Sequence, residues 1–160
     1  MRIFAIDSGN VESGYAVVDL PTFKVIECGK VNNNELLKAV PLLSSAADIF
    51  ALEMIASYGK PVGRDVFDTC VWIGRFIQVG EKDPTYIYRK EEKICLCNDI
   101  RAKDTNIRHA LIDRYAKHDF KTGKGTKKNP DTFYGVSKDA WQAIAVAVTA
   151  YEREVCDELF

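Results

Sequence analysis

The stretch RIFAIDSGNVESGYAVVD, residues 2–19, decides which class of fold this chain adopts. It begins with an apolar run that ends at Asp7, and it closes with a second strand-like run over residues 14–19. The intervening Ser8-Gly9-Asn10 favours a tight turn, because these residue types suit turn conformations. Residues 23–29 then alternate as a third strand. Three strands in such close succession indicate a β-meander rather than parallel strands joined by helices.

The rest of the chain alternates between helical and strand patterns. We expect a helix that Asn33 or Asn34 caps and that Pro41 kinks or shortens. Residues 48–54 are almost entirely apolar, which is typical of a buried central strand. The further predicted elements are a helix from residue 65, short strands at 85–88 and 93–97, a helix at 104–117, a loop at 120–135 and a final helix that Ser137 caps.

The composition is that of an ordinary globular domain, with 160 residues, 47 % hydrophobic and 28 % charged. This length predicts one domain over residues 1–160. No apolar run approaches the roughly 18–20 residues of a membrane span, and the first residues do not resemble a signal peptide. We therefore expect a cytoplasmic protein with no membrane partner.

The five cysteines are odd in number and scattered, which indicates reduced thiols rather than a disulfide framework. Cys95 and Cys97 form a C-x-C pair in what reads as a buried strand. Because no second pair and no nearby histidine accompanies them, the four ligands of structural zinc are not complete.

Three acidic residues carry the functional signal. Asp7 ends the first strand, Glu53 lies near the end of the central strand, and Asp139 opens the otherwise small and apolar last helix. A lone carboxylate in apolar surroundings is costly to ionise unless it is paired or binds a cation. Oxygen ligands favour Mg²⁺ or Mn²⁺, and two such ions can clamp the attacking and leaving oxygens of a phosphodiester. Taken singly, each acid could instead have a local role at turn amides, an arginine or a helix N-terminus.

The motifs around these acids resemble those of the RuvC-like branch of the ribonuclease H-like superfamily, which comprises Holliday-junction resolvases and related phage nucleases. The resemblance spans nearly the whole chain. Its main motifs are Ile6–Gly9 with Ser13–Val17, Ala51–Glu53 and Asp139–Ala147. Four further segments are similar to a phage and prophage group within that branch: Met54–Gly59, Trp72–Phe76, Arg101–Asp104 and Gly125–Pro130.

The resemblance implies an α/β fold of the ribonuclease H-like type. Its five-stranded mixed sheet would have three antiparallel N-terminal strands, then parallel strands, and flanking helices. It also implies an endonuclease that uses one or two Mg²⁺ or Mn²⁺ ions to hydrolyse DNA, with branched DNA or four-way junctions as substrate. Asp7 and Glu53 would take metal-ligand roles, and Asp139 the first acidic position of the last-helix motif. Related resolvases are homodimers, which suits a junction cut at two sites.

Gln142 departs from this pattern, because RuvC enzymes commonly carry a second acid at that position. The Gln142 carbonyl can ligate Mg²⁺, but it brings no charge, so one ion would bind more weakly or another acid would complete the site. Asp104, Glu12 and Asp131 are the candidates. The departure also leaves open a catalytically weak or inactive RuvC-like DNA-binding protein.

A third hypothesis is a nucleotide-binding fragment, since Asp7-x-Gly9 resembles the phosphate loop of sugar kinases and actin-like ATPases. Those proteins pair two such domains and are far longer than this chain. No second glycine-rich phosphate loop is present in the sequence.

Basic residues predict how DNA would be held. Residues 101–128 contain nine basic and three acidic residues, so this segment is +6 in a chain of net charge −1. We expect sequence-independent phosphate contacts from it, although a lysine-rich loop can also be merely solvated. The residues proposed here are Arg101, Lys103, Lys121, Lys124, Lys127 and Lys128.

A second predicted DNA surface is the loop after Glu53, which holds Tyr58, Lys60 and Arg64. Tyr58 could stack on an unpaired base or simply pack against the protein. On the following helix, Trp72, Ile73 and Phe76 have core spacing, and part of that face could instead form the dimer contact.

Overall fold

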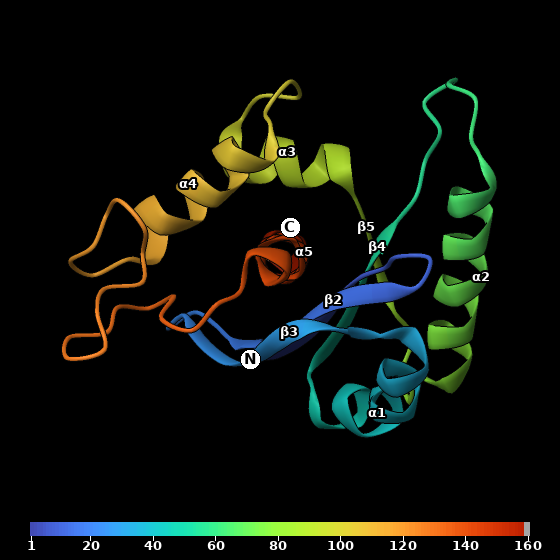
Figure 1. Ribbon diagram of the computed structural model, residues 1–160, viewed down its shortest axis with the longest axis horizontal. Coiled ribbons are helices and arrows are strands. Elements are labelled where there is room, and N and C mark those ends of the chain that lie inside the picture. The colour runs from blue at the N-terminus through green and yellow to red at the C-terminus, as the bar shows by residue number, and fades with distance from the viewer. Residues whose placement is uncertain (159–160) are drawn as a thin grey trace.

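The computed structural model describes residues 1–158, so residues 159–160 of the predicted domain lie outside it. One five-stranded sheet, in the order β3-β2-β1-β4-β5, organises the chain (Figure 1). In chain order the elements are β1 (Arg2–Asp7), β2 (Glu12–Asp19), β3 (Lys24–Asn32), α1 (Asn33–Ala46), β4 (Ile49–Met54), α2 (Arg64–Val79), β5 (Thr85–Tyr88), α3 (Arg89–Cys97), α4 (Asp104–Tyr115), the 3-10 turn η1 (Lys138–Ala140) and α5 (Trp141–Glu158).

The sheet is mixed, as the sequence predicts. Strands β1, β2 and β3 are antiparallel, with Asp7 opposite Gly14 in the first pair. Strand β4 then lies parallel to β1, and β5 lies parallel to β4. The predicted α/β fold with an antiparallel meander followed by parallel strands is therefore confirmed.

Helices cover both faces of the sheet, which explains why β1 is apolar at successive positions. Ile3 and Ala5 face the layer that contains α5, whereas Phe4 and Ile6 face the layer that contains α1 and α2. Strands buried on both faces read as continuous apolar runs instead of alternating ones. In Figure 1, α5 lies between the sheet and the pair α3–α4.

Helix α5 is buried nearly all round over its first three turns. Every residue from Ala143 to Val148 is fully inaccessible. A helix that is apolar on all sides belongs in the interior, and α5 satisfies this by packing on the sheet and beneath α3 and α4. Its N-terminal end is thereby fixed at one edge of the central strands.

The predicted strand at 93–97 is wrong, because these residues form the second half of helix α3. Glu92 and Leu96, four residues apart, are the two buried positions of that helix. A short apolar run is compatible with either a strand or a buried helix. Here the helix formers Arg89-Lys90-Glu91-Glu92-Lys93 that precede and enter the run favour the helix.

Two predicted caps are also wrong. The side chain of Asn32, rather than Asn33 or Asn34, caps α1 by accepting from the Asn34 amide at 2.9 Å. Ser137 precedes the 3-10 turn η1 and makes no side-chain capping bond, while α5 itself begins at Trp141. Pro41 does not shorten α1, which continues to Ala46 because its buried face, including Val40 and Ser44, extends past the proline.

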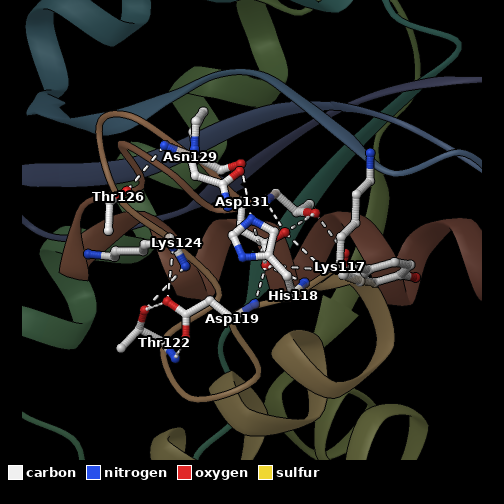
Figure 2. A network of polar contacts seen from close by, with 12 residues as sticks. Lys117, His118, Asp119, Thr122, Lys124, Thr126, Asn129 and Asp131 are labelled. Carbon is white, nitrogen blue, oxygen red and sulfur yellow. Dashed lines mark hydrogen bonds and ion pairs between the residues drawn. The ribbon is translucent and has the colours of Figure 1, made fainter.

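The loop between α4 and η1 is held by the buried carboxylate of Asp131 (Figure 2). That carboxylate accepts from the amides of Lys117, His118 and Asp119 at 2.9, 2.9 and 2.7 Å, and also from the amide of Thr132. Burial opposes ionisation of Asp131, but the four amide donors together lower its pKa below the ordinary range. Asp131 thus ties the start of the loop to its end.

A second carboxylate, that of Asp119, organises the tip of the same loop (Figure 2). It accepts from the Thr122 hydroxyl and from the amides of Thr122 and Gly125, and these bonds lower its pKa to about 2. Gly125 has a positive φ of 66°, a conformation that favours glycine. The lysine-rich loop is therefore held in a defined conformation by hydrogen bonds to its own two carboxylates.

No helix within residues 1–158 is long and apolar enough to cross a membrane. All five cysteines fall in this part of the chain and are free thiols.

Asp131→Asn is expected to destabilise the protein at pH 7 and to flatten its acid unfolding. Because the folded pKa of Asp131 is lowered, its stabilising effect is complete above the unfolded value of about 3.9. The effect is lost as the pH falls through the folded value. The measurement is the melting temperature from pH 7 down to pH ~2.5, with exposed Asp113→Asn on α4 as the charge-matched control. A wild-type advantage that does not shrink in acid would contradict this role.

Candidate active site

Parallel pairing of β1 with β4 brings two of the predicted acids together. Ile6 lies opposite Leu52 in that pairing. Asp7 and Glu53 are the next residues on the two strands, so they lie next to each other. Carboxyl ends of parallel strands meet at one edge of a sheet, where open α/β folds place their ligands. The Asp7 and Glu53 carboxyl groups interact, since each shifts the pKa of the other, and the Glu53 side chain is only 17 % exposed.

This pair is costly to ionise without a cation. Burial raises the pKa of Asp7, while the charge of Arg89 opposes the rise. Burial, and then the negative charges of Glu92 and Asp7, raise the pKa of Glu53 well above its ordinary value. Two adjacent carboxyl groups cannot both ionise cheaply. A bound divalent ion would remove that repulsion.

Asp139 lies beside the pair, across Gly14 of β2. A Cβ at Gly14 would be 2.8 Å from the Asp139 carbonyl oxygen and 3.8 Å from Oδ2 of Asp7, so only glycine allows η1 to approach the strand this closely. The Asp139 side chain is 54 % exposed and pairs with Lys30 of β3 at 3.5 Å. Asp139 is thus near the Asp7–Glu53 pair, with its carboxylate held by a lysine.

A buried network fixes the turn that follows Asp7. The Gly9 amide donates to Oγ of Ser13 at 3.0 Å, and Ser13 donates to Oδ1 of Asn33 at 2.6 Å. Nδ2 of Asn33 then donates to the Gly9 carbonyl at 2.9 Å. Asn33, which the sequence suggested as a helix cap, therefore positions the turn after Asp7 instead.

A cleft of about 720 Å³ is lined by the residues that the sequence predicts as metal ligands. Asp7, Glu53, Asp139 and Gln142 all line it, and so do Glu12 and Asp104, two of the three acids suggested to complete the site. Asp131, the third, is wrong for that role, because its carboxylate is fully buried among the loop amides. The basic residues of the cleft are Lys30, Arg89, Arg108 and Lys138.

None of the nine predicted DNA-binding residues lines this cleft. Tyr58 and Lys60 are exposed between β4 and α2, Arg64 is the exposed first residue of α2, and Arg101 and Lys103 are exposed before α4. The lysine-rich loop between α4 and η1 holds the other four residues, Lys121, Lys124, Lys127 and Lys128. Among the basic residues of segment 101–128, the one that lines the cleft is Arg108, whose guanidinium lies 5.3 Å from the centroid of the Trp141 ring.

Sequence reasoning missed Arg89 and Glu92 of helix α3. Arg89 lies 3.8 Å from Glu53 and 3.6 Å from Glu92, and it also contacts Asp104. Glu92 is fully buried and accepts a hydrogen bond from the Gln142 amide. The available signal was an Arg and a Glu three residues apart, followed by an apolar residue at helical spacing. The strand assignment of 93–97 concealed it.

The donor set fits a hard divalent cation with one adjustment. No group of three or more His, Cys, Asp or Glu side chains within residues 1–158 is close enough to hold a metal as the side chains stand. The site nevertheless offers oxygen ligands from Asp7 and Glu53, and Asp139 would join them on leaving Lys30. Buried polar atoms without partners also occur here, namely Oγ of Ser8 and Nε of Arg108 in the cleft and Oε1 of Glu92 behind it. Such unsatisfied atoms are typical of a site that binds a ligand.

Comparison with known proteins identifies the fold. No protein-family model and no curated protein sequence matches the chain significantly. Among solved structures, Thermus thermophilus RuvC is similar with a TM-score of 0.67 at 12 % identity, covering 97 % of this chain and 96 % of that one. The same protein in complex with a Holliday-junction substrate gives 0.67 at 13 % identity, with 96 % of each chain covered.

A fowlpox virus resolvase in complex with its substrate Holliday-junction DNA is also similar. Its TM-score is 0.53 at 15 % identity, over 94 % of this chain and 99 % of that chain. At such low identities the likeness concerns the fold. The chain therefore has the ribonuclease H-like fold of RuvC-type Holliday-junction resolvases.

Proposed function

We propose that this protein is a metal-dependent DNA endonuclease that hydrolyses phosphodiester bonds in branched DNA, four-way junctions in particular. The observation that carries the proposal is the half-buried Asp7–Glu53 pair at the carboxyl edge of β1 and β4, with Asp139 beside it in one cleft. The fold of proteins whose structures contain Holliday-junction DNA supports the choice of substrate. Residues 1–160 would act as one nuclease domain of a phage or prophage type.

Asp7, Glu53 and Asp139 would hold one or two Mg²⁺ or Mn²⁺ ions. A bound ion supplies an activated water and stabilises charge on the phosphate. The remaining work falls to side chains of the cleft: Lys30, Arg108 and Lys138 can bind phosphate oxygens, and Arg89 holds the Glu53 carboxylate from 3.8 Å. Lys30 would have two roles. It pairs with Asp139 when no ion is bound, and it would contact a phosphate once Asp139 turns to an ion.

Gln142 is better suited to orient Glu53 than to ligate an ion. Its side-chain nitrogen lies 3.4 Å from Oε2 of Glu53 and also donates to Glu92. An amide nitrogen cannot ligate a cation, and two carboxylate acceptors fix which end of the amide faces them. The second candidate function, a DNA-binding protein with weak or no catalysis, is favoured by this neutral side chain and by the Lys30–Asp139 pair.

DNA would extend beyond the cleft over two surfaces. The lysine-rich loop presents Lys121, Lys127 and Lys128 to solvent. Because internal hydrogen bonds already order this loop, it would lose less conformational entropy on contacting phosphates. Tyr58 is 61 % exposed and borders a hollow of about 300 Å³ together with Lys90 and Lys93 of α3. An aromatic ring beside lysines suits stacking of an unpaired base next to its phosphate.

Asp7→Asn is expected to slow nicking of a synthetic four-way junction at least ~100-fold, because a catalytic metal supplies several kcal/mol and ~1.4 kcal/mol is tenfold. The assay follows a labelled junction with Mg²⁺ or Mn²⁺, with a linear duplex of the same sequence as control substrate. Asp113→Asn is the control variant. Unchanged cutting by Asp7→Asn would refute the chemistry, and equal cutting of the duplex would refute the specificity. Tight junction binding without any cutting by the wild type would select the second candidate function.

Lys127→Ala with Lys128→Ala is expected to weaken junction binding and to reduce the slope of log K against log salt by about 2, one per lost phosphate contact. Binding is measured by fluorescence anisotropy over a range of salt concentrations. Lys38→Ala, an exposed lysine on α1, should leave the slope unchanged. A double variant with the wild-type slope would show that the loop is only solvated.

We also propose that the protein is a homodimer that associates through α2. Of the residues named on this helix, Ile73 and Phe76 are buried in the core and Trp72 is half-buried against Phe76. The free apolar surface belongs instead to Phe67 and Val71, which are 60 % and 61 % exposed and lie one helical turn apart. A two-fold pair would present two clefts to the two strands of a junction.

Phe67→Glu with Val71→Glu is expected to convert a dimer into a monomer, because two charges on each subunit would face a desolvated apolar contact. Sedimentation velocity gives the mass, and circular dichroism verifies the fold. Leu42→Glu, which changes a 75 % exposed apolar residue on α1, is the matched control. A wild type that is monomeric at all accessible concentrations would exclude the α2 dimer.

A further inference from the structure

A chain of polar contacts runs from the cleft into the protein interior. Gln142, at the start of α5, donates through one side-chain nitrogen to Oε2 of Glu53 and to Oε2 of Glu92. Glu53 lines the cleft, whereas Glu92 lies behind it with no exposed surface. Arg89, one turn before Glu92 on α3, lies within 4 Å of both carboxylates. Three elements, β4, α3 and α5, therefore meet in one network.

The fold alone does not account for Glu92. An apolar side chain at this buried position of α3 would pack against the same neighbours without the cost of desolvating a carboxylate. One of its two oxygens, Oε1, has no hydrogen-bond partner. The other oxygen meets the Gln142 amide, which in turn meets a proposed metal ligand. Glu92 thus reaches the cleft through Gln142 and Arg89.

We propose that Glu92 is a positioning residue for the metal site. It fixes the rotamer of Gln142, so that the amide nitrogen stays turned toward Glu53 and holds one oxygen of that carboxylate. Arg89 holds the other oxygen, Oε1, from 3.8 Å. Glu53 is then presented to an ion in a single orientation. The inference rests on the proposed function, since it concerns how a ligand for Mg²⁺ or Mn²⁺ is held.

The test separates metal affinity from folding. Glu92→Met removes the acceptor but keeps an unbranched side chain of similar length, and its melting temperature should equal or exceed that of the wild type. Its affinity for Mn²⁺ alone, measured from the free-ion signal in electron paramagnetic resonance, should nevertheless fall about 10–100-fold, the usual effect of losing an outer-shell partner. Glu92→Gln keeps an acceptor oxygen for the Gln142 amide and should retain most of the affinity.

Gln142→Met breaks the same chain of contacts at its middle and should cause a similar loss. Combining it with Glu92→Met should add little, because the two residues act in series. Glu91→Gln removes the neighbouring charge, which pairs with Arg153 outside the cleft, and it should leave Mn²⁺ affinity unchanged.

Several outcomes would overturn the inference. Glu92→Met or Gln142→Met binding Mn²⁺ as tightly as the wild type would do so, and the second variant decides the matter if the first does not fold. A loss in Glu92→Gln equal to that in Glu92→Met would assign the effect to charge rather than to positioning. A wild type that binds no Mn²⁺ would refute the proposed function itself, and the role of Glu92 with it.

Discussion

Two interacting carboxyl groups at the ends of neighbouring parallel strands are the constraint on which the rest of this structure depends. Asp7 and Glu53 are half-buried, mutually repulsive when ionised, and fixed by the pairing of β1 with β4. Such an arrangement costs folding free energy unless cations compensate it. The surrounding chain supplies Arg89 and Lys30 as its own cations, and the site leaves room for a divalent one. The proposed metal site would therefore oppose folding stability at this edge of the sheet until an ion binds.

The architecture serves this edge from three sides. The buried Ser13–Asn33 pair fixes the turn after Asp7, and Gly14 lets η1 approach with Asp139. Helix α5, buried nearly all round, carries Gln142 to the pair, while α3 contributes Arg89. These supports come from segments that are far apart in the sequence, namely residues 13–14, 33, 89 and 139–142. Closing them around one cleft requires the complete sheet with helices on both faces.

Charge is separated by position in this protein. The net charge of −1 conceals a segment of +6, and the acids that balance it include those of the cleft. Within the lysine-rich loop, the carboxylates of Asp119 and Asp131 accept hydrogen bonds from backbone amides and do not pair with the lysines. Lys121, Lys127 and Lys128 therefore face solvent. Bound divalent ions would make the working surface still more positive, which favours a polyanionic partner.

Sequence alone determined the mixed sheet, the positions of Asp7 and Glu53 at strand ends, and the loop with its basic charge. These features follow from local patterns, namely apolar runs that end at an acid and turn residues between strands. The sequence could not give the contacts of Asn33, Arg89, Glu92 or Asp131, because each side chain meets residues that are distant in the chain. Asn33, for example, has the residue type and position of a helix cap, yet it bonds to the turn after Asp7. The sequence favours a strand over the second half of helix α3, since a short apolar run suits both. Only the tertiary structure decided which charges meet, because contacts between distant side chains depend on how all the layers pack together.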